Sequence, residues 1–233
     1  MNDQHQPKAA GGGFRPLHEI LREHARRRPD KPAYLWYGQA ISYAELDRAS
    51  DAFAARLARL GVRKGEPVAL FMQNCPQYLM AHYGIQKLGA IVCPCGPLNK
   101  EHELEYQLND LGARVVVAAA PLLDTVDKVR LRTALEHVFV VHYADLLPPS
   151  PTIDLPDDLA RMREEPRAVP EGCEDFLEVA RSGEPARSKG GAAYGQDGAC
   201  PQGGAKKLAT RDMAWLFRHW TSSLRTCLQC AKL

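Results

Sequence analysis

Apolar residues recur at steps of three and four over residues 14–28, which predicts an amphipathic helix near the start of the chain. Two short apolar runs follow, at residues 33–37 and 40–43, on either side of Gly38 and Gln39. A two-residue break of this type between apolar runs is typical of a β-hairpin. The sequence therefore predicts a helix followed by a hairpin.

A second helical pattern begins at Ser42, which stands three residues before Glu45 in the S-x-x-E spacing of a capping box. Gly61 follows the last apolar position, and glycine is common just past a helix end. The apolar stripe in between consists of Leu46, Ala49, Phe53, Leu57 and Leu60. Burial of this stripe is needed to make the helix stable.

From residue 67 onward, short apolar runs alternate with helical patterns. Runs that are apolar throughout are typical of strands covered on both faces, and helices between them call for parallel pairing. The predicted fold class is α/β, a mostly parallel sheet flanked by helices. The predicted strands are 67–72, 90–93, 114–118 and 137–143, and the predicted helices are 76–88, 101–111 and 122–135.

The periodicity stops after residue 143. Three prolines stand within residues 148–151, and residues 146–209 are expected to form an irregular Gly/Pro-rich segment. Thr210 can cap one last amphipathic helix over residues 210–224. The expected organisation is a flexible leader (1–13), an α/β subdomain (14–145), the irregular segment (146–209), and a terminal helix with its tail (210–233).

The 233 residues carry a net charge of +2, and 45% of them are hydrophobic. This composition is typical of a globular protein and argues against a nucleic-acid or membrane-surface partner. No apolar run approaches the roughly 18 residues of a membrane-spanning helix. Residues 1–13 lack the apolar core of a signal peptide. We therefore expect a cytoplasmic protein with no integral membrane segment and no nucleic-acid partner.

Seven cysteines are scattered along the chain. An odd number without dense spacing argues against the disulfide scaffold of a small secreted domain. Cys227 and Cys230 have the spacing of half a zinc site, but no second pair follows, so no metal site is predicted. Cys93 and Cys95 are predicted to be buried small hydrophobic residues.

Three segments occur in a distinctive order, namely 61–77, 84–90 and 94–99, and Glu103-Leu104 follows them. In this order they closely resemble the N-terminal part of the adenylate-forming enzymes, most of all the bacterial long-chain fatty acyl-CoA synthetases. The resemblance covers about residues 15–145. None of these segments is catalytic, and the family's later motifs that complete the site are not found, so the resemblance indicates a partial N-terminal domain of that fold.

The resemblance implies an AMP-forming ligase that works in two steps. A fatty acid carboxylate attacks the α-phosphate of ATP, which gives an acyl-adenylate and pyrophosphate. Coenzyme A then displaces AMP to form the acyl-CoA. ATP, Mg²⁺ and coenzyme A are the implied cofactors, since Mg²⁺ and fixed cations stabilise charge on the transferring phosphoryl group.

The family holds the ATP phosphates with a loop of the form S/T-S-G-T-T-G-x-P-K-G, and residues 194–207 retain its outline. The candidate nucleotide-binding residues are Gly195, Gly198, Pro201, Gly203 and Lys206. Both threonines of the motif are missing, Asp197 stands among the phosphate-facing positions, and Gln202 takes the place of the lysine. Loss of a single positioned donor can cost ~10²–10³ in rate. No catalytic residue is therefore predicted.

On composition alone, the same residues are typical of a flexible Gly-rich linker. A shift of reading frame around residues 180–205 is a second hypothesis, which the other two frames of the DNA would test. We expect an inactive fragment of a fatty acid–CoA ligase, with a separately encoded C-terminal half as its partner. The alternative is a non-catalytic binding or scaffold module that uses the α/β subdomain.

Overall fold

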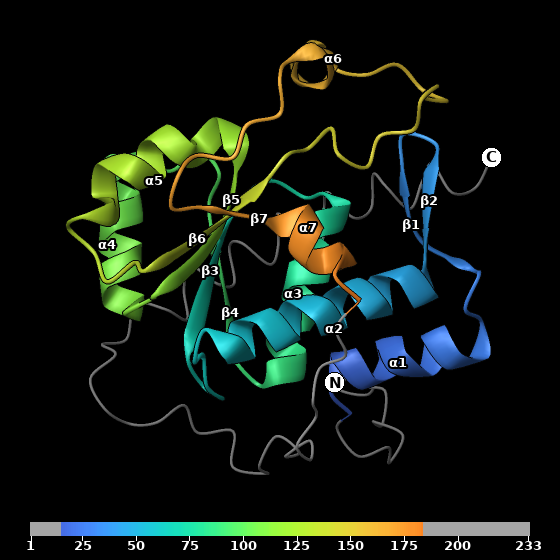
Figure 1. Ribbon diagram of the computed structural model, residues 1–233, viewed down its shortest axis with the longest axis horizontal. Coiled ribbons are helices and arrows are strands. Elements are labelled where there is room, and N and C mark those ends of the chain that lie inside the picture. The colour runs from blue at the N-terminus through green and yellow to red at the C-terminus, as the bar shows by residue number, and fades with distance from the viewer. Residues whose placement is uncertain (1–14, 184–233) are drawn as a thin grey trace, which may run out of the picture. The chain divides into compact units, whose positions relative to one another are not determined.

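Five strands form one parallel sheet within residues 15–183, the part of the chain that the computed structural model describes (Figure 1). The order across the sheet is β4-β3-β5-β6-β7, and all four neighbouring pairs are parallel. The strands are β3 (Pro67–Phe71), β4 (Ile91–Cys95), β5 (Val115–Ala119), β6 (His137–Val141) and β7 (Glu174–Asp175). Every residue of β5 is buried, as expected of a central strand covered on both faces. The α/β prediction is confirmed.

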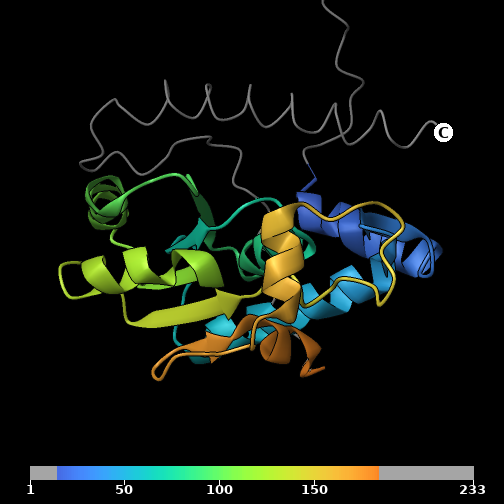
Figure 2. The same cartoon turned by 90° about the horizontal axis from the view of Figure 1, so that it is seen from above.

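Helices cover both faces of this sheet (Figures 1 and 2). One face packs against α2 (Tyr43–Arg59), α3 (Pro76–Leu88) and α7 (Phe176–Arg181), and the other against α4 (Glu101–Leu111) and α5 (Leu123–Arg130). The alternation along β3 explains the division, because Val68 and Leu70 point into one cluster while Ala69 and Phe71 point into the other.

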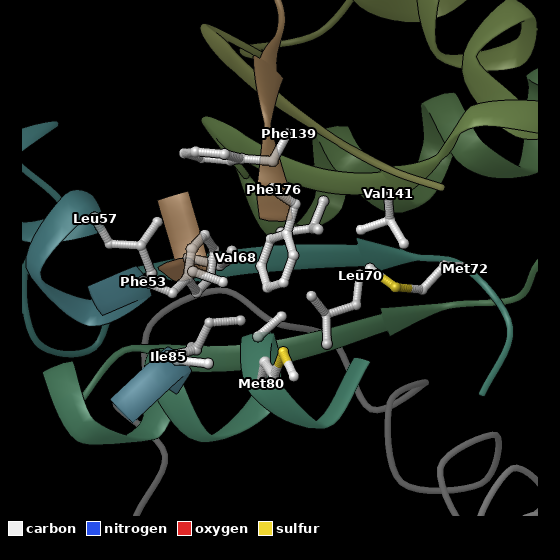
Figure 3. Close-up of a cluster of buried hydrophobic side chains, with 14 of the residues drawn as sticks. Phe53, Leu57, Val68, Leu70, Met72, Met80, Ile85, Phe139, Val141 and Phe176 are labelled. Carbon is white, nitrogen blue, oxygen red and sulfur yellow. The ribbon is translucent and has the colours of Figure 1, made fainter. Parts of the chain in front are cut away.

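Three phenylalanines join distant elements in the hydrophobic cluster between the sheet and helices α2, α3 and α7 (Figure 3). The ring of Phe53 on α2 lies 5.2 Å from that of Phe139 on β6 and 5.0 Å from that of Phe176 on α7. All three side chains are fully buried. The contacts between these rings therefore hold α2 and α7 against the sheet.

The first helix and the hairpin are confirmed as α1 (Leu17–Arg27), β1 (Pro32–Trp36) and β2 (Gln39–Ser42). The predicted turn residues are wrong by one position. Trp36 pairs with Gln39, so Tyr37 and Gly38 form the turn, with φ of 49° and 99°. A tight hairpin turn of this kind needs positive φ at both central residues, which glycine supplies more readily than tyrosine.

The capping box is also present. The Glu45 N–H donates to the Ser42 hydroxyl at 3.2 Å, and the Ser42 N–H donates to the Glu45 carboxylate at 2.7 Å. Gly61, just past the end of α2, has a φ of 79°. Both ends of this helix are therefore specified by local sequence.

Residues 120–135 and the stretch after residue 145 differ from the expectation. The predicted helix 122–135 consists of a short 3₁₀ turn (Ala120–Leu122) and α5, which ends at Arg130. Within the segment expected to be irregular, the structure has α6 (Asp157–Glu164), β7 and α7. These elements have two to eight residues each, too few for a periodic pattern to stand out. The predicted helix 210–224 lies outside the described residues.

Candidate functional site

The order of the strands reverses between β3 and β5. The chain passes from β3 to β4 on one side, and then crosses back to β5 and β6 on the other. In open parallel sheets, ligands bind outside the carboxyl ends of the strands at this reversal, where two neighbouring connections diverge. A binding site is therefore expected at the loops that follow β3 and β5.

A cavity of about 320 Å³ lies at this edge. Its floor consists of residues that follow the ends of four strands, and its walls come from the tip of the β1–β2 hairpin and from α6. The lining residues are Trp36, Tyr37, Gln73, Asn74, Pro97, Pro121, Leu122, Tyr143, Pro156, Asp158, Leu159 and Met162. Most of these side chains are apolar or aromatic, which is typical of small-molecule and peptide-binding surfaces.

Two hydrogen bonds tie the floor of the cavity together. The Tyr143 hydroxyl, after β6, accepts from the backbone N–H of Gln73, after β3, at 2.7 Å. The Gln77 Nε2 on α3 donates to the His142 carbonyl at 3.0 Å. Burial raises the pKa of Tyr143 well above its usual range. The neutral phenol therefore connects the two loops through this hydrogen bond. It is unsuited to act as an acid or base near neutral pH.

Three of the six buried side-chain polar atoms that lack a hydrogen bond in residues 15–183 belong to segments near this edge. Among the described residues, Trp36 Nε1, Gln77 Oε1 and His142 Nε2 are buried and make no hydrogen bond. Buried polar groups in folded proteins are nearly always paired, so such atoms mark a place where the structure is incompletely satisfied. All three belong to segments at or next to the carboxyl edge.

The cavity does not fit a nucleotide triphosphate. Phosphate oxygens need cationic side chains or clustered N–H groups. The cavity lining contains one charged residue, Asp158, whose carboxylate forms an ion pair with Arg161. Residues 15–183 also contain no group of three or more His, Cys, Asp or Glu side chains that could hold a metal ion. The lining of this cavity therefore fits neither ATP nor Mg²⁺.

The candidate nucleotide-binding residues lie elsewhere in the chain. Gly195, Gly198, Pro201, Gly203 and Lys206 all fall beyond residue 183, outside the described residues, and their role stays a prediction. The residues that line the cavity were not predicted. A usable signal was present for Gln73 and Asn74, since they directly follow an apolar strand, where functional residues of parallel sheets collect.

Buried cysteines lie in and beside the sheet. Cys93 and Cys95, on β4, are buried, and burial raises their pKa values to about 11 and about 12. These thiols stay protonated and behave as small hydrophobic side chains, as predicted. No helix of residues 15–183 is both long enough and apolar enough to cross a membrane.

The most similar relatives found include two bacterial long-chain-fatty-acid–CoA ligases. The chain is 38% identical to the one from Salmonella typhimurium over 135 residues and 34% identical to the one from Bacillus subtilis over 132 residues. These alignments cover 58% and 57% of this chain. In both cases they cover 24% of the relative, so the chain matches about a quarter of the length of these ligases.

Solved acyl-CoA ligases share the fold. An anthranilate CoA ligase with bound anthranoyl-AMP superposes with a TM-score of 0.60 at 24% identity, covering 74% of this chain and 29% of that one. A long-chain-fatty-acid–CoA ligase from Archaeoglobus fulgidus gives 0.50 at 28% identity, covering 54% and 27%. The model of one family, described as AMP-binding enzyme, matches residues 21–177, which is more than half of the chain. The chain belongs to the AMP-binding enzyme family.

Proposed function

We propose that this chain is the N-terminal part of an AMP-forming fatty acid–CoA ligase. The observation that supports this most directly is the 38% identity with a long-chain-fatty-acid–CoA ligase over 135 residues. The complete reaction would join a fatty acid to coenzyme A through an acyl-adenylate, with ATP and Mg²⁺. We also propose that the protein acts in the cytoplasm, as its cysteine pattern predicts.

We further propose that the 233 residues alone do not catalyse this reaction. The support comes from the loop at residues 194–207, where Asp197 would repel phosphate and Gln202 would supply no positive charge. Each lost phosphate contact costs about 3–4 kcal/mol of transition-state stabilisation when the donor is well positioned. Several losses together would leave a rate close to that of the uncatalysed reaction.

Pyrophosphate release tests this proposal. The purified chain is incubated with ATP, Mg²⁺, oleate and coenzyme A, beside the Salmonella typhimurium ligase as the positive control. We expect background release from the chain and millimolar or no binding of ATP in a calorimetric titration. Turnover well above background would contradict the proposed inactivity.

The alternative, a non-catalytic binding module, is favoured by one specific observation. The cavity at the carboxyl edge is lined mostly by apolar and aromatic residues and lacks the cations that a nucleotide needs. Such a surface suits a polypeptide partner, and a separately encoded C-terminal half of the ligase is the partner that we propose.

A further inference from the structure

A second cavity, of about 370 Å³, lies where α1 packs along α2 (Figure 1). It shares no lining residue with the cavity at the carboxyl edge. All of its lining residues are charged, namely Arg15, Glu19, Arg22, Arg26 and Asp47. We call it the arginine cavity. Three guanidinium groups around one hollow suit an anion, because the planar guanidinium matches the geometry of an oxyanion.

The spacing of residues along α1 brings these charges together. Glu19, Arg22 and Arg26 are separated by three and four residues, so they lie on one face of the helix. Asp47 belongs to α2. Both helices are anchored in the same hydrophobic cluster, through the buried Leu21 on α1 and the buried Leu46 on α2. Rigid elements therefore carry the cavity lining.

Most of the guanidinium donors are free for a ligand. Arg15 forms one ion pair, with Glu23 at 2.9 Å, and Arg22 forms one, with Asp51 at 3.3 Å. Arg26 is exposed and forms no ion pair with any other residue of 15–183. Each guanidinium has five N–H donors, so these two pairs leave donors on all three arginines.

The two carboxylates of the lining differ in their surroundings. Asp47 is compensated by Lys87 on α3, whose Nζ lies 2.6 Å from the Asp47 carboxylate and 2.9 Å from that of Asp51. The Lys87 side chain has no exposed surface, so this cation is fixed behind the lining. Glu19 forms no ion pair within residues 15–183, and it is the lining group that would oppose an anion.

We infer that the arginine cavity binds a phosphate group, as inorganic phosphate or as the phosphomonoester of a larger molecule. A phosphate dianion can accept charge-assisted hydrogen bonds from several guanidinium groups at once. Its two negative charges also gain more from three cations than they lose to the single uncompensated carboxylate of Glu19. The inference does not depend on the proposed ligase function.

The first test titrates the full chain with inorganic phosphate at constant ionic strength and follows backbone amide signals by NMR. We expect saturable shifts in α1. Arg26→Ala should weaken binding by ~10-fold, since it removes charge-assisted hydrogen bonds. Arg26 forms no ion pair with residues 15–183, so the fold should tolerate this change. Arg28→Ala is the matched control, because Arg28 is also exposed but does not line the cavity.

A second variant should change the affinity in the opposite direction. Glu19→Gln removes the uncompensated carboxylate and keeps a side chain of similar size, so we expect phosphate to bind ~3-fold more tightly or better. No phosphate-dependent shifts in α1 would overturn the inference. Equal weakening by Arg26→Ala and Arg28→Ala would also overturn it, because only the general charge of the surface would then matter.

Vesicles distinguish the two sources of the phosphate group. The chain is sedimented with phosphatidylcholine vesicles that contain or lack phosphatidic acid, whose headgroup is a phosphomonoester. Retention that requires phosphatidic acid and that Arg26→Ala abolishes would support the site and identify a lipid headgroup. Saturable binding of inorganic phosphate without retention on vesicles would support the site and identify a soluble phosphate compound.

Discussion

His82 is a partly buried imidazole on α3. Its Nε2 lies 3.1 Å from Gln86 Nε2, and its ring lies 6.1 Å from that of Tyr78 and 5.7 Å from that of Tyr83. Burial lowers the pKa of His82, because the charged imidazolium loses its hydration. In the unfolded chain the pKa returns to its ordinary value of about 6.5.

This shift gives the protein an acid-sensitive stability. Below about pH 6.5 the unfolded state binds a proton at His82 before the folded state does, so the free energy of unfolding falls as the pH decreases. Urea unfolding at pH 7.5 and pH 5.5 should therefore show a smaller loss of stability in His82→Gln than in the wild type. His102→Gln, on the exposed side of α4, controls for the removal of one imidazole. Identical losses in all three proteins would contradict the prediction.

Gly84 on α3 lies in close contact with α2. A Cβ atom at this position would lie 2.9 Å from both the Phe53 ring and the Ser50 carbonyl. Alanine favours helix by up to about 1 kcal/mol over glycine, but the overlap with backbone costs about 1–3 kcal/mol. We expect Gly84→Ala to lower the free energy of unfolding in denaturant titration. An unchanged or raised midpoint would show that the helices can separate at no cost.

At the scale of elements, one arginine connects the segment after α6 to the sheet. Arg167 donates to the Asp145 carboxylate at 2.7 Å and also forms an ion pair with Asp175. The two carboxylate side chains are only 7% and 4% exposed. Asp175 also accepts the Glu178 N–H at 2.9 Å and so caps α7. Arg167 therefore helps to hold β7 and α7 in place, together with the Arg56–Glu174 ion pair and the Phe53–Phe176 contact.

Removal of this arginine should be costly. Arg167→Ala removes the positive charge that pairs with two nearly buried carboxylates. We expect the free energy of unfolding to fall by about 2–3 kcal/mol. This loss is smaller than that for a fully buried pair because Arg167 is partly exposed. Arg161→Ala breaks an ion pair whose side chains are both more than 70% exposed, and should cost about 0.5 kcal/mol or less. Chemical denaturation of both variants compares the two values directly. Equal losses would mean that burial does not set the strength of the Arg167 pairs.

At the scale of the whole molecule, the alternation of apolar runs and helical patterns was enough to predict the parallel sheet. Each of the four predicted strands is present, because a strand buried on both faces leaves a continuous apolar run. Strand β7 has two residues, and its carboxylates are paired with arginines from distant segments. No local pattern encodes such an element, so its place in the sheet depends on tertiary contacts.

The candidate site was harder to predict than the fold. The residues that line the cavity extend along the chain from Trp36 to Met162. They come from several segments that are separated in sequence. The predicted nucleotide-binding residues belong to a loop motif, which a contiguous stretch of sequence can reveal. The cavity instead depends on the reversal of strand order between β3 and β5, which periodicity does not report.

The sequence by itself determined the fold class, the positions of the longer helices and strands, the capped ends of α2 and the likeness to adenylate-forming enzymes. These features follow from local periodicity, capping chemistry and short motifs. Only the tertiary structure decided the order of the strands, the incorporation of β7 and the cavity at the carboxyl edge. They depend on contacts between residues far apart in the chain, such as Arg56 with Glu174, whose joint effect no single segment encodes.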